Sequence, residues 1–279
     1  MALDSRPRQA PRLSEPRIVG ISLVRNEDLF VETAVRNAAG FCDEFHIADH
    51  ASIDRTPAIL RVLAGELPNI HLHSVRHPAE SQDLIRHFAG SRTWIFGVDG
   101  DEIYEPDRLA RLRQSILSGV FEKHWMIFGN VLHVTKLDER RRTASGHLAP
   151  PCRSMTKLYN FSAIEAWNGY TPERLHGGTV RFRAGYSRED RRMLNEETSW
   201  EEADFRCLHL CFLKRSSLDS ENTARRNIIE TFGPTRLHTL WYTLSRLVGF
   251  QKAAQWKCSR YMRGPEATVS VEAFFPNGA

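Results

Sequence analysis

The chain has 279 residues, of which 41% are hydrophobic, and this is ample for one large α/β domain, or two small ones, with a buried core. Its formal net charge is only +4, far below the basic density of a dedicated nucleic-acid binder, so no nucleic-acid partner is expected. A modest positive field suits an anionic small molecule instead.

Apolar stretches and cysteines restrict the cellular compartment. No apolar run approaches the roughly 20 residues needed to cross a bilayer, and the first residues lack the apolar centre of a signal peptide. We therefore expect a soluble, cytoplasmic protein without a transmembrane segment. The 5 cysteines are odd in number and widely spaced, so neither a disulfide framework nor a zinc knuckle is expected. Cys207 and Cys211 lie in an apolar run and are expected to be core side chains.

The first predicted elements follow a flexible tail, residues 1–16, which is rich in proline and arginine. The apolar, β-branched run Arg17–Val24 predicts a strand, and apolar residues at helical spacing from Val31 onward predict a helix. Between them lies a turn, Arg25–Asp28, in which Asn26 is a candidate helix cap.

Strand and helix then alternate. Further strands are predicted at 45–48, 69–75 and 93–98. The pair Thr56-Pro57 opens a second helix, and a third is expected to be capped by Ser81. Short, nearly all-apolar strands of this kind are typical of a parallel sheet covered on both faces. The side chains expected to face inward from these two helices are Ile59, Val62, Leu63, Leu67, Leu84, Ile85 and Phe88.

The alternation ends near residue 120. Strands are expected at 125–134, 179–183 and 205–213, followed by helices near 217–232 and 235–256. No linker separates two domains, so we expect one α/β domain over 17–215 and a helical C-terminal extension over 216–279 packed on it. This extension is aromatic and basic, and we expect it to form the acceptor side of the site or a homodimer contact.

Polar residues follow every predicted strand of the first half. Ligands of open parallel α/β sheets bind beyond the carboxyl ends of the strands. These ends carry Arg25-Asn26-Glu27, Asp49-His50, His77, and Asp99-Gly100-Asp101-Glu102. An acid at one such end is often only a helix cap, but four polar ends together predict a binding site.

The group Asp99-Gly100-Asp101-Glu102 predicts a metal site. Its three carboxylates repel one another unless a cation lies among them, and oxygen ligands suit Mg²⁺ or Mn²⁺ rather than zinc. Such a metal usually completes its coordination with phosphate oxygens, so a diphosphate is the expected ligand. Gly100 would let that ligand approach the backbone closely. The alternative is an acidic loop that merely caps the helix at Asp107.

Three segments in register resemble a known family. Ile21–Asp28 (ISLVRNED), His46–Thr56 (HIADHASIDRT) and Trp94–Glu102 (WIFGVDGDE) resemble, in order and spacing, segments of the family 2 inverting glycosyltransferases of GT-A fold. The subgroup with an RNE turn and a D-x-D-E motif is the most similar. The resemblance covers roughly residues 18–215, most clearly up to about 105. It implies a GT-A fold, a Rossmann-like mixed sheet flanked by helices.

The resemblance also implies residue roles. Asp49 would hydrogen-bond a uracil-type base, although His50 and Ala51 depart from the family pattern beside it. Asp99 would lie by the ribose and the metal, Asp101 would ligate the metal, and His209 would complete the metal shell. Lys214 and Arg215 would neutralise the diphosphate. The nucleotide-sugar set implied in this way is Val24, Arg25, Asn26, Glu27, Asp49, Asp99, Gly100 and Lys214.

Inversion requires a base near the acceptor nucleophile. Glu173 and His176 are the candidates from a segment similar to the family's acceptor motif, in which Gly177 stands where an acid is expected. Asp204 and Glu202 are further candidates.

The function implied is transfer, with inversion, of a hexose or N-acetylhexosamine from a UDP-sugar, assisted by Mn²⁺ or Mg²⁺. The expected acceptor is a soluble small molecule, such as a natural-product precursor, or a carrier-bound one. A lipopolysaccharide or lipid-linked glycan acceptor is the alternative. A non-catalytic nucleotide-sugar-binding protein is the alternative of another class, and a nucleotidyltransferase is disfavoured because no Gly-rich phosphate loop is present.

Overall fold

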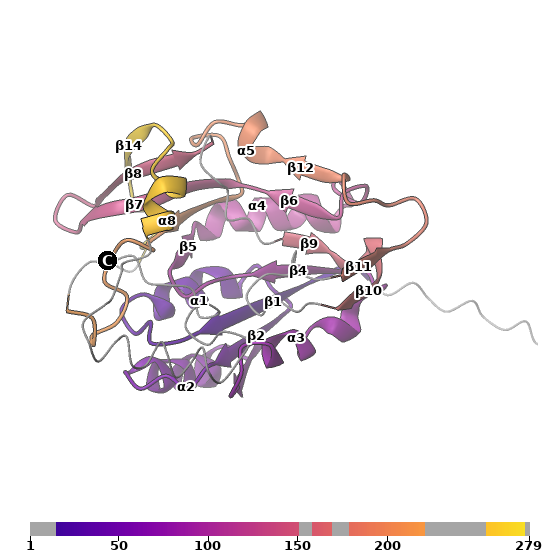
Figure 1. Ribbon diagram of the computed structural model, residues 1–279, viewed down its shortest axis with the longest axis horizontal. Coiled ribbons are helices and arrows are strands. Elements are labelled where there is room, and N and C mark those ends of the chain that lie inside the picture. The colour runs from indigo at the N-terminus through magenta and orange to yellow at the C-terminus, as the bar shows by residue number, and fades with distance from the viewer. Residues whose placement is uncertain (1–14, 151–157, 169–178, 221–254, 277–279) are drawn as a thin grey trace, which may run out of the picture.

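The computed structural model describes residues 15–150, 158–168, 179–220 and 255–276, and shows a mixed α/β architecture built on two main sheets (Figure 1). The larger sheet has 7 strands in the order β12-β6-β9-β4-β1-β2-β3. β1 is an interior strand of this sheet, parallel to β2 on one side and to β4 on the other. The strands are β1 (Arg17–Val24), β2 (Glu44–Asp49), β3 (Ile70–Ser74), β4 (Thr93–Gly97), β6 (Met126–Phe128), β9 (Leu158–Asn160) and β12 (Arg191–Met193).

Helices cover one face of this sheet. The helices α1 (Val31–Ala39), α2 (Thr56–Glu66) and α4 (Pro106–Leu117) contribute Val35, Leu63 and Leu112 to a core shared with Phe45 and Phe96 of the sheet. Their apolar residues recur at helical spacing, so each helix has one face that can be buried. Each of these helices therefore covers the sheet with about three turns.

The opposite face is covered by shorter elements. Ile85 and Phe88 pack there with Trp125 and Tyr159. These elements are α3 (Glu80–Asp83), the 3₁₀ turns Arg86–Phe88 and Phe161–Ala163, and the hairpin of β10 (Ile164–Asn168) and β11 (Thr179–Phe182).

The second sheet has 5 strands in the order β14-β8-β7-β13-β5. Here β13 runs parallel to β7 and antiparallel to β5, so the strand just after Asp101 pairs with one more than 100 residues later. The C-terminal helix α8 (Gln255–Tyr261) lies over β7 (Figure 1). The other elements are β5 (Glu102–Tyr104), β7 (Asn130–Asp138), β8 (Thr143–Ala149), α5 (Leu194–Glu197), β13 (Arg206–His209) and β14 (Glu266–Ser270).

The predicted strands and the first two predicted helices of the first half are present, whereas the third helix is reduced to the four-residue α3 and a 3₁₀ turn at Arg86–Phe88. Three details also differ. Val62 is 56% exposed, and Leu60 takes the buried position on α2 instead. Ser81 lies inside α3 and bonds the carbonyl of Pro78, so it is not a cap. Asn26 does not cap α1 either, because the residue at that cap is Phe30.

The described residues of the expected helical extension include a strand as well as a helix. The helix is α8, and the strand is β14, which pairs antiparallel with β8 and extends the second sheet. The helices expected near 217–232 and 235–256 lie almost wholly outside the described residues. Among the helices that can be described, none combines the length and apolar character of a bilayer crossing.

Candidate functional site

Two loops at the carboxyl ends of β1 and β2 are joined by Asn26. Its backbone has φ of 52°, in the left-handed region that asparagine tolerates better than most residues. Its N–H donates to Ser52 Oγ at 2.9 Å, and its Oδ1 accepts the N–H of Ile53 at 2.8 Å. Asn26 is therefore a link between the two loops, rather than a helix cap.

Asp28 joins these loops to the segment after β13. Its carboxylate accepts the N–H and the hydroxyl of Ser217, both at 2.7 Å, and the Nε of Arg55 at 3.0 Å. Burial alone would raise the pKa of Asp28, but the bonds from Ser217 and Arg55 outweigh it and lower the pKa to about 2. The hydroxyl of Ser216 donates to Asp54 at 2.6 Å beside it. Three chain segments thus meet in one hydrogen-bonded junction.

A buried ion cluster lies next to this junction. Arg215 Nη1 lies 2.5 Å from Asp101 Oδ2 and 3.3 Å from Glu27 Oε1. Asp101 is 1% exposed and Glu27 6%. Burial lowers the pKa of Arg215, but attraction to Asp101 and Glu27 more than offsets this and raises the pKa above its usual value. The sequence indicated a cation beside the acids of residues 99–102, and in the structure the guanidinium of Arg215 lies against one of them, Asp101.

Gly100 is required by Glu27. A Cβ at residue 100 would lie 1.9 Å from Glu27 Oε2 and 3.0 Å from its Cδ. The bare backbone predicted for the approach of a ligand thus also accommodates the side chain that binds Arg215. Asp99, directly before Gly100, is half-buried and donates its N–H to Glu102 Oε2 at 3.2 Å. Glu102 itself is fully buried.

His209, at the end of β13, approaches the carboxylate of Asp101. Its Nε2 lies 3.9 Å from Asp101 Oδ2, and its Nδ1 lies 2.8 Å from Nδ1 of His133 on β7. His209 is thus both packed in a strand and directed at the acidic group. His133, His209 and Cys211 are all buried, with their donor atoms within 4.8 Å of one another.

The residues around Asp101 fit a divalent metal. A carboxylate oxygen and an imidazole nitrogen 3.9 Å apart can both reach one ion, because each ligand bond is close to 2.1 Å. The mixed oxygen and nitrogen donors suit Mn²⁺ better than Mg²⁺, which prefers oxygen ligands. The half-buried Asp99 adds a third candidate donor at the same strand end.

The nucleoside side is expected to include Val24, Arg25 and Asp49, which lie at or directly after the carboxyl ends of β1 and β2. Val24 pairs with Asp49 across the end of β1 and β2, so the two loops start side by side. Asp49 is half-buried, and Arg25 donates to the carbonyl of His50 at 3.3 Å. Burial, followed by the charge of Arg25, lowers the pKa of the His50 ring. Lys214, half-buried, adjoins Arg215.

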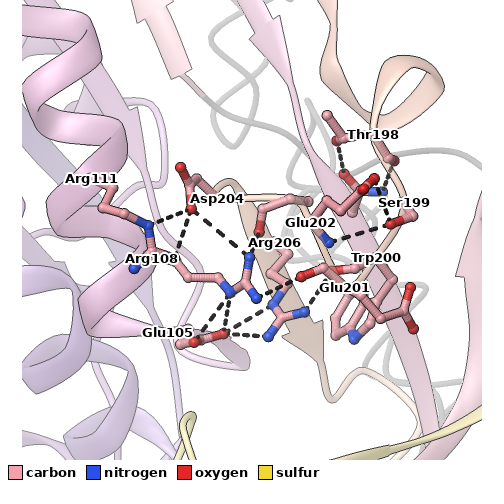
Figure 2. Close-up of polar contacts among 12 residues, drawn as sticks. Glu105, Arg108, Arg111, Thr198, Ser199, Trp200, Glu201, Glu202, Asp204 and Arg206 are labelled. Carbon is pink, nitrogen blue, oxygen red and sulfur yellow. Dashed lines mark hydrogen bonds and ion pairs between the residues drawn. The ribbon is translucent and has the colours of Figure 1, made fainter.

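Of the four candidate bases, two lie within the part of the chain that the structure describes. Glu173 and His176 lie outside the described residues. Asp204 accepts Nε of Arg111 on α4 at 2.9 Å, and Glu202 accepts the hydroxyl of Ser199 at 3.0 Å (Figure 2). Both acids precede β13, whereas His209 ends it, so they lie at the opposite end of this strand from Asp101.

The surroundings of Asp204 form a separate ion network between α4 and the start of β13. Arg206 donates two bonds to Glu105, at 2.9 and 2.6 Å, and Arg108 donates to the carbonyls of Glu201 and Ala203 (Figure 2). These contacts fix the entry of β13, and thereby the register that places His209 opposite His133.

Two groups near the acids were not among the residues expected from the sequence. Ser216 and Ser217 join the loops through Asp54 and Asp28, and a serine pair directly after Arg215 was a visible signal. His133 lies in an apolar run, where only its alternation with Leu132 and Val134 indicates a separate face.

No protein-family model and no curated protein sequence gives a significant match to this chain. Among solved structures, 53% of the chain is similar to 29% of S. aureus TarS, at 14% identity and a TM-score of 0.37. In a second comparison, 44% of the chain is similar to 36% of the mannosyltransferase PcManGT from Pyrobaculum calidifontis in complex with GDP-Man and Mn²⁺, at 21% identity and a TM-score of 0.32. For S. aureus TarS 1-349 in complex with UDP, 45% of this chain covers 37% of that chain, at 16% identity and a TM-score of 0.32. The chain spans roughly a third of these proteins, and likenesses of such low score carry no weight for activity or substrate.

Proposed function

We propose that the protein is a metal-dependent glycosyltransferase that takes a sugar from a nucleoside-diphosphate sugar, with a UDP-sugar as the first candidate. One observation carries this proposal. Asp101, Glu27, Arg215 and His209 converge at the carboxyl ends of strands, where α/β sheets bind ligands. Two acids, a buried guanidinium and an imidazole are what a diphosphate with its metal requires.

Each residue then has a role that its position supports. Asp101, Asp99 and His209 would hold the metal, which supplies Lewis-acid stabilisation of the leaving diphosphate when bound. Arg215 shares its charge between Asp101 and Glu27, so a diphosphate oxygen at this point meets a guanidinium that is already oriented. Lys214 would add a second positive charge for the diphosphate.

The nucleoside is proposed to lie over the two joined loops. Asp49 would accept from the base, and Arg25, Asn26, Glu27 and Val24 would form the surrounding wall. Because Asn26 and Asp28 bind the loops to each other and to Ser217, this wall is held in place before ligand binds. Such preorganisation lowers the entropy lost on binding.

Transfer with inversion to a hydroxyl requires a base, for which Glu173 and His176 remain the proposed candidates. The proposed acceptor is a soluble or carrier-bound molecule, with a lipid-linked glycan as the alternative. The second candidate function, a nucleotide-sugar-binding protein without turnover, would use the same residues.

A paired experiment tests the proposal. UDP, GDP and ADP, each with and without Mn²⁺, are compared by their effect on the melting temperature, and UDP-sugar hydrolysis is then assayed. We expect a nucleotide and Mn²⁺ together to stabilise more than the sum of each alone, because each supplies ligands to the other. Asp101→Asn should abolish this cooperation.

Asp107→Asn is the matched control, because Asp107 is an exposed acid in the first turn of α4, outside the ion cluster. An equal loss of this cooperative stabilisation in Asp101→Asn and Asp107→Asn would support the alternative in which the acidic segment only caps the helix. Cooperative binding without sugar release or transfer would support the non-catalytic alternative.

A further inference from the structure

The inner face of the second sheet changes abruptly from apolar to ionisable. One row across the strands consists of Ala149, Val131, Cys207 and Tyr104, which are cross-strand partners and belong to the main core. Two residues further along each strand, the next row has ionisable side chains throughout. In strand order from β14 to β5 this row is Glu266, His147, His133, His209 and Glu102.

This row leads from the surface to the ion cluster. Glu266 is exposed, His147 is 8% exposed, and His133, His209 and Glu102 are at most 3% exposed. Direct cross-strand partners lie side by side on one face of a sheet. Buried polar side chains in such a row require hydrogen-bond partners, because a buried polar group without a partner loses its hydration with nothing in exchange.

His133 and His209 satisfy each other. Their Nδ1 atoms lie 2.8 Å apart, so one ring must donate and the other accept. The ring of His133 is also held by Tyr261 of α8, stacked at a centroid distance of 4.4 Å and an interplanar angle of 7°. Tyr261 contacts the His209 ring edge-on at 5.6 Å. The orientation of both rings is thus determined by the fold.

The tautomer of His209 follows from its two neighbours. Its Nε2 faces Asp101 at 3.9 Å, and this nitrogen must present a lone pair if it is to bind a metal held by Asp101. The proton of neutral His209 then resides on Nδ1, which can donate to His133. The Nδ1 of His133 must therefore be the acceptor.

We propose that His133 is a positioning residue that holds His209, through this Nδ1 to Nδ1 hydrogen bond, in the orientation and tautomer required to ligate a divalent metal beside Asp101. This rests on the proposed function, in which His209 is a metal ligand. Groups that hydrogen-bond a ligating histidine typically change metal affinity by about 10- to 100-fold when they are replaced.

The test measures Mn²⁺ binding directly, by the loss of the free Mn²⁺ signal in electron paramagnetic resonance, with UDP present. UDP binding without metal is measured in parallel. His133→Leu removes the acceptor and puts an apolar side chain of moderate size in its place. His133→Asn places an amide oxygen near the position of Nδ1, whereas His133→Gln places it near Nε2.

We expect His133→Leu to weaken Mn²⁺ binding by about 10- to 100-fold and to leave metal-free UDP binding unchanged. His133→Asn should restore most of the affinity, and His133→Gln should restore much less. If His133→Leu does not fold, the contrast between the Asn and Gln variants still decides. Equal affinity of wild type with a folded His133→Leu variant, or of Asn with Gln, would overturn the role of His133.

Cys211→Ser provides the control for a different arrangement. If His133, His209 and Cys211 formed a metal site of their own, Cys211→Ser would weaken binding as much as His133→Leu, and Co²⁺ would show thiolate charge-transfer absorption. That result would overturn the positioning role, whereas Cys211→Ser with wild-type affinity would support it. Absence of any Mn²⁺ binding by wild type with UDP would overturn the proposed function together with this inference.

Discussion

Arg215 donates from Nη1 to Oδ2 of Asp101 across 2.5 Å, in a position where both side chains are almost fully buried. Buried charges are stable only when they are paired, and removing one partner of a buried pair costs about 3–5 kcal/mol. The pair therefore explains how the side chains of Asp101 and Glu27 are accommodated in the interior. It also means that a metal at Asp101 must share this carboxylate with Arg215.

Arg215→Met should destabilise the protein by about 3–5 kcal/mol, because Asp101 and Glu27 lose their common cation. Mn²⁺ should then raise the melting temperature more in Arg215→Met than in wild type, since the metal can replace the missing charge. Arg215→Lys should lose less stability than Arg215→Met. Thermal unfolding of wild type and both variants, with and without Mn²⁺, measures these differences.

Arg36→Met is the control for the Arg215 series, because Arg36 pairs with Glu32 and Glu66 on the surface. Surface pairs contribute about 0–1 kcal/mol, so its loss should be small and independent of Mn²⁺. A response to Mn²⁺ equal to that of Arg215→Met would contradict the assignment of the metal to Asp101.

Gly100→Ala should displace Glu27, since the new Cβ would meet its carboxylate at 1.9 Å. We expect a loss of about 1–3 kcal/mol and weaker binding of UDP with Mn²⁺, measured by denaturant unfolding and calorimetry. Gly65→Ala is the matched control, because this exposed helical glycine has nothing within 4 Å of the added Cβ. It should stabilise α2 by about 0.5–1 kcal/mol and leave binding unchanged.

Acid should loosen the junction at Asp28. The pKa of Asp28 is lowered to about 2 in the folded protein, so its stabilising effect is complete above the unfolded-state value near 3.8 and is lost as the pH falls through 2. The expected loss in the free energy of unfolding is on the order of 2 kcal/mol. Ser217→Ala, which removes one of the bonds, should flatten this part of the pH profile in urea unfolding. An unchanged profile would show that Ser217 does not set the pKa.

Asp204→Asn should have little effect on turnover. Asp204 is held by Arg111 at the start of β13, away from Asp101, whereas loss of a general base slows an enzyme by about 10²–10⁴-fold. We expect a loss of stability of about 0–1 kcal/mol instead. Rates of transfer for Asp204→Asn and Glu202→Gln measure this, and a fall of the size expected for a base would restore Asp204 to that role.

The first half of the fold could be predicted because its signals are local. Arg17–Val24 and the runs that form β2, β3 and β4 are apolar and bounded by polar turns, so periodicity alone locates them. Helix faces were less certain, since Val62 and Leu60 are both apolar and only packing selects which is buried. Five-residue β14 alternates between exposed and half-buried positions, and its short signal depends on pairing with β8.

The candidate site was predictable as to its acids but not as to what neutralises them. Three carboxylates at a strand end require a cation wherever they are buried, and this follows from charge alone. That the cation includes Arg215 depends on the return of the chain after β13, which no local pattern encodes. The same holds for His133, whose role arises only when β7 and β13 pair in their observed register.

The junction at Asp28 has a consequence for the order in which the chain can mature. The two loops that it fixes are encoded before residue 56, yet their partners Ser216 and Ser217 are synthesised some 160 residues later. During translation, the early strands and helices can assemble while the loops still lack these bonds and the Arg215 charge. The junction and the buried ion pairs are therefore completed late, when Arg215 and the two serines have left the ribosome and reached their partners.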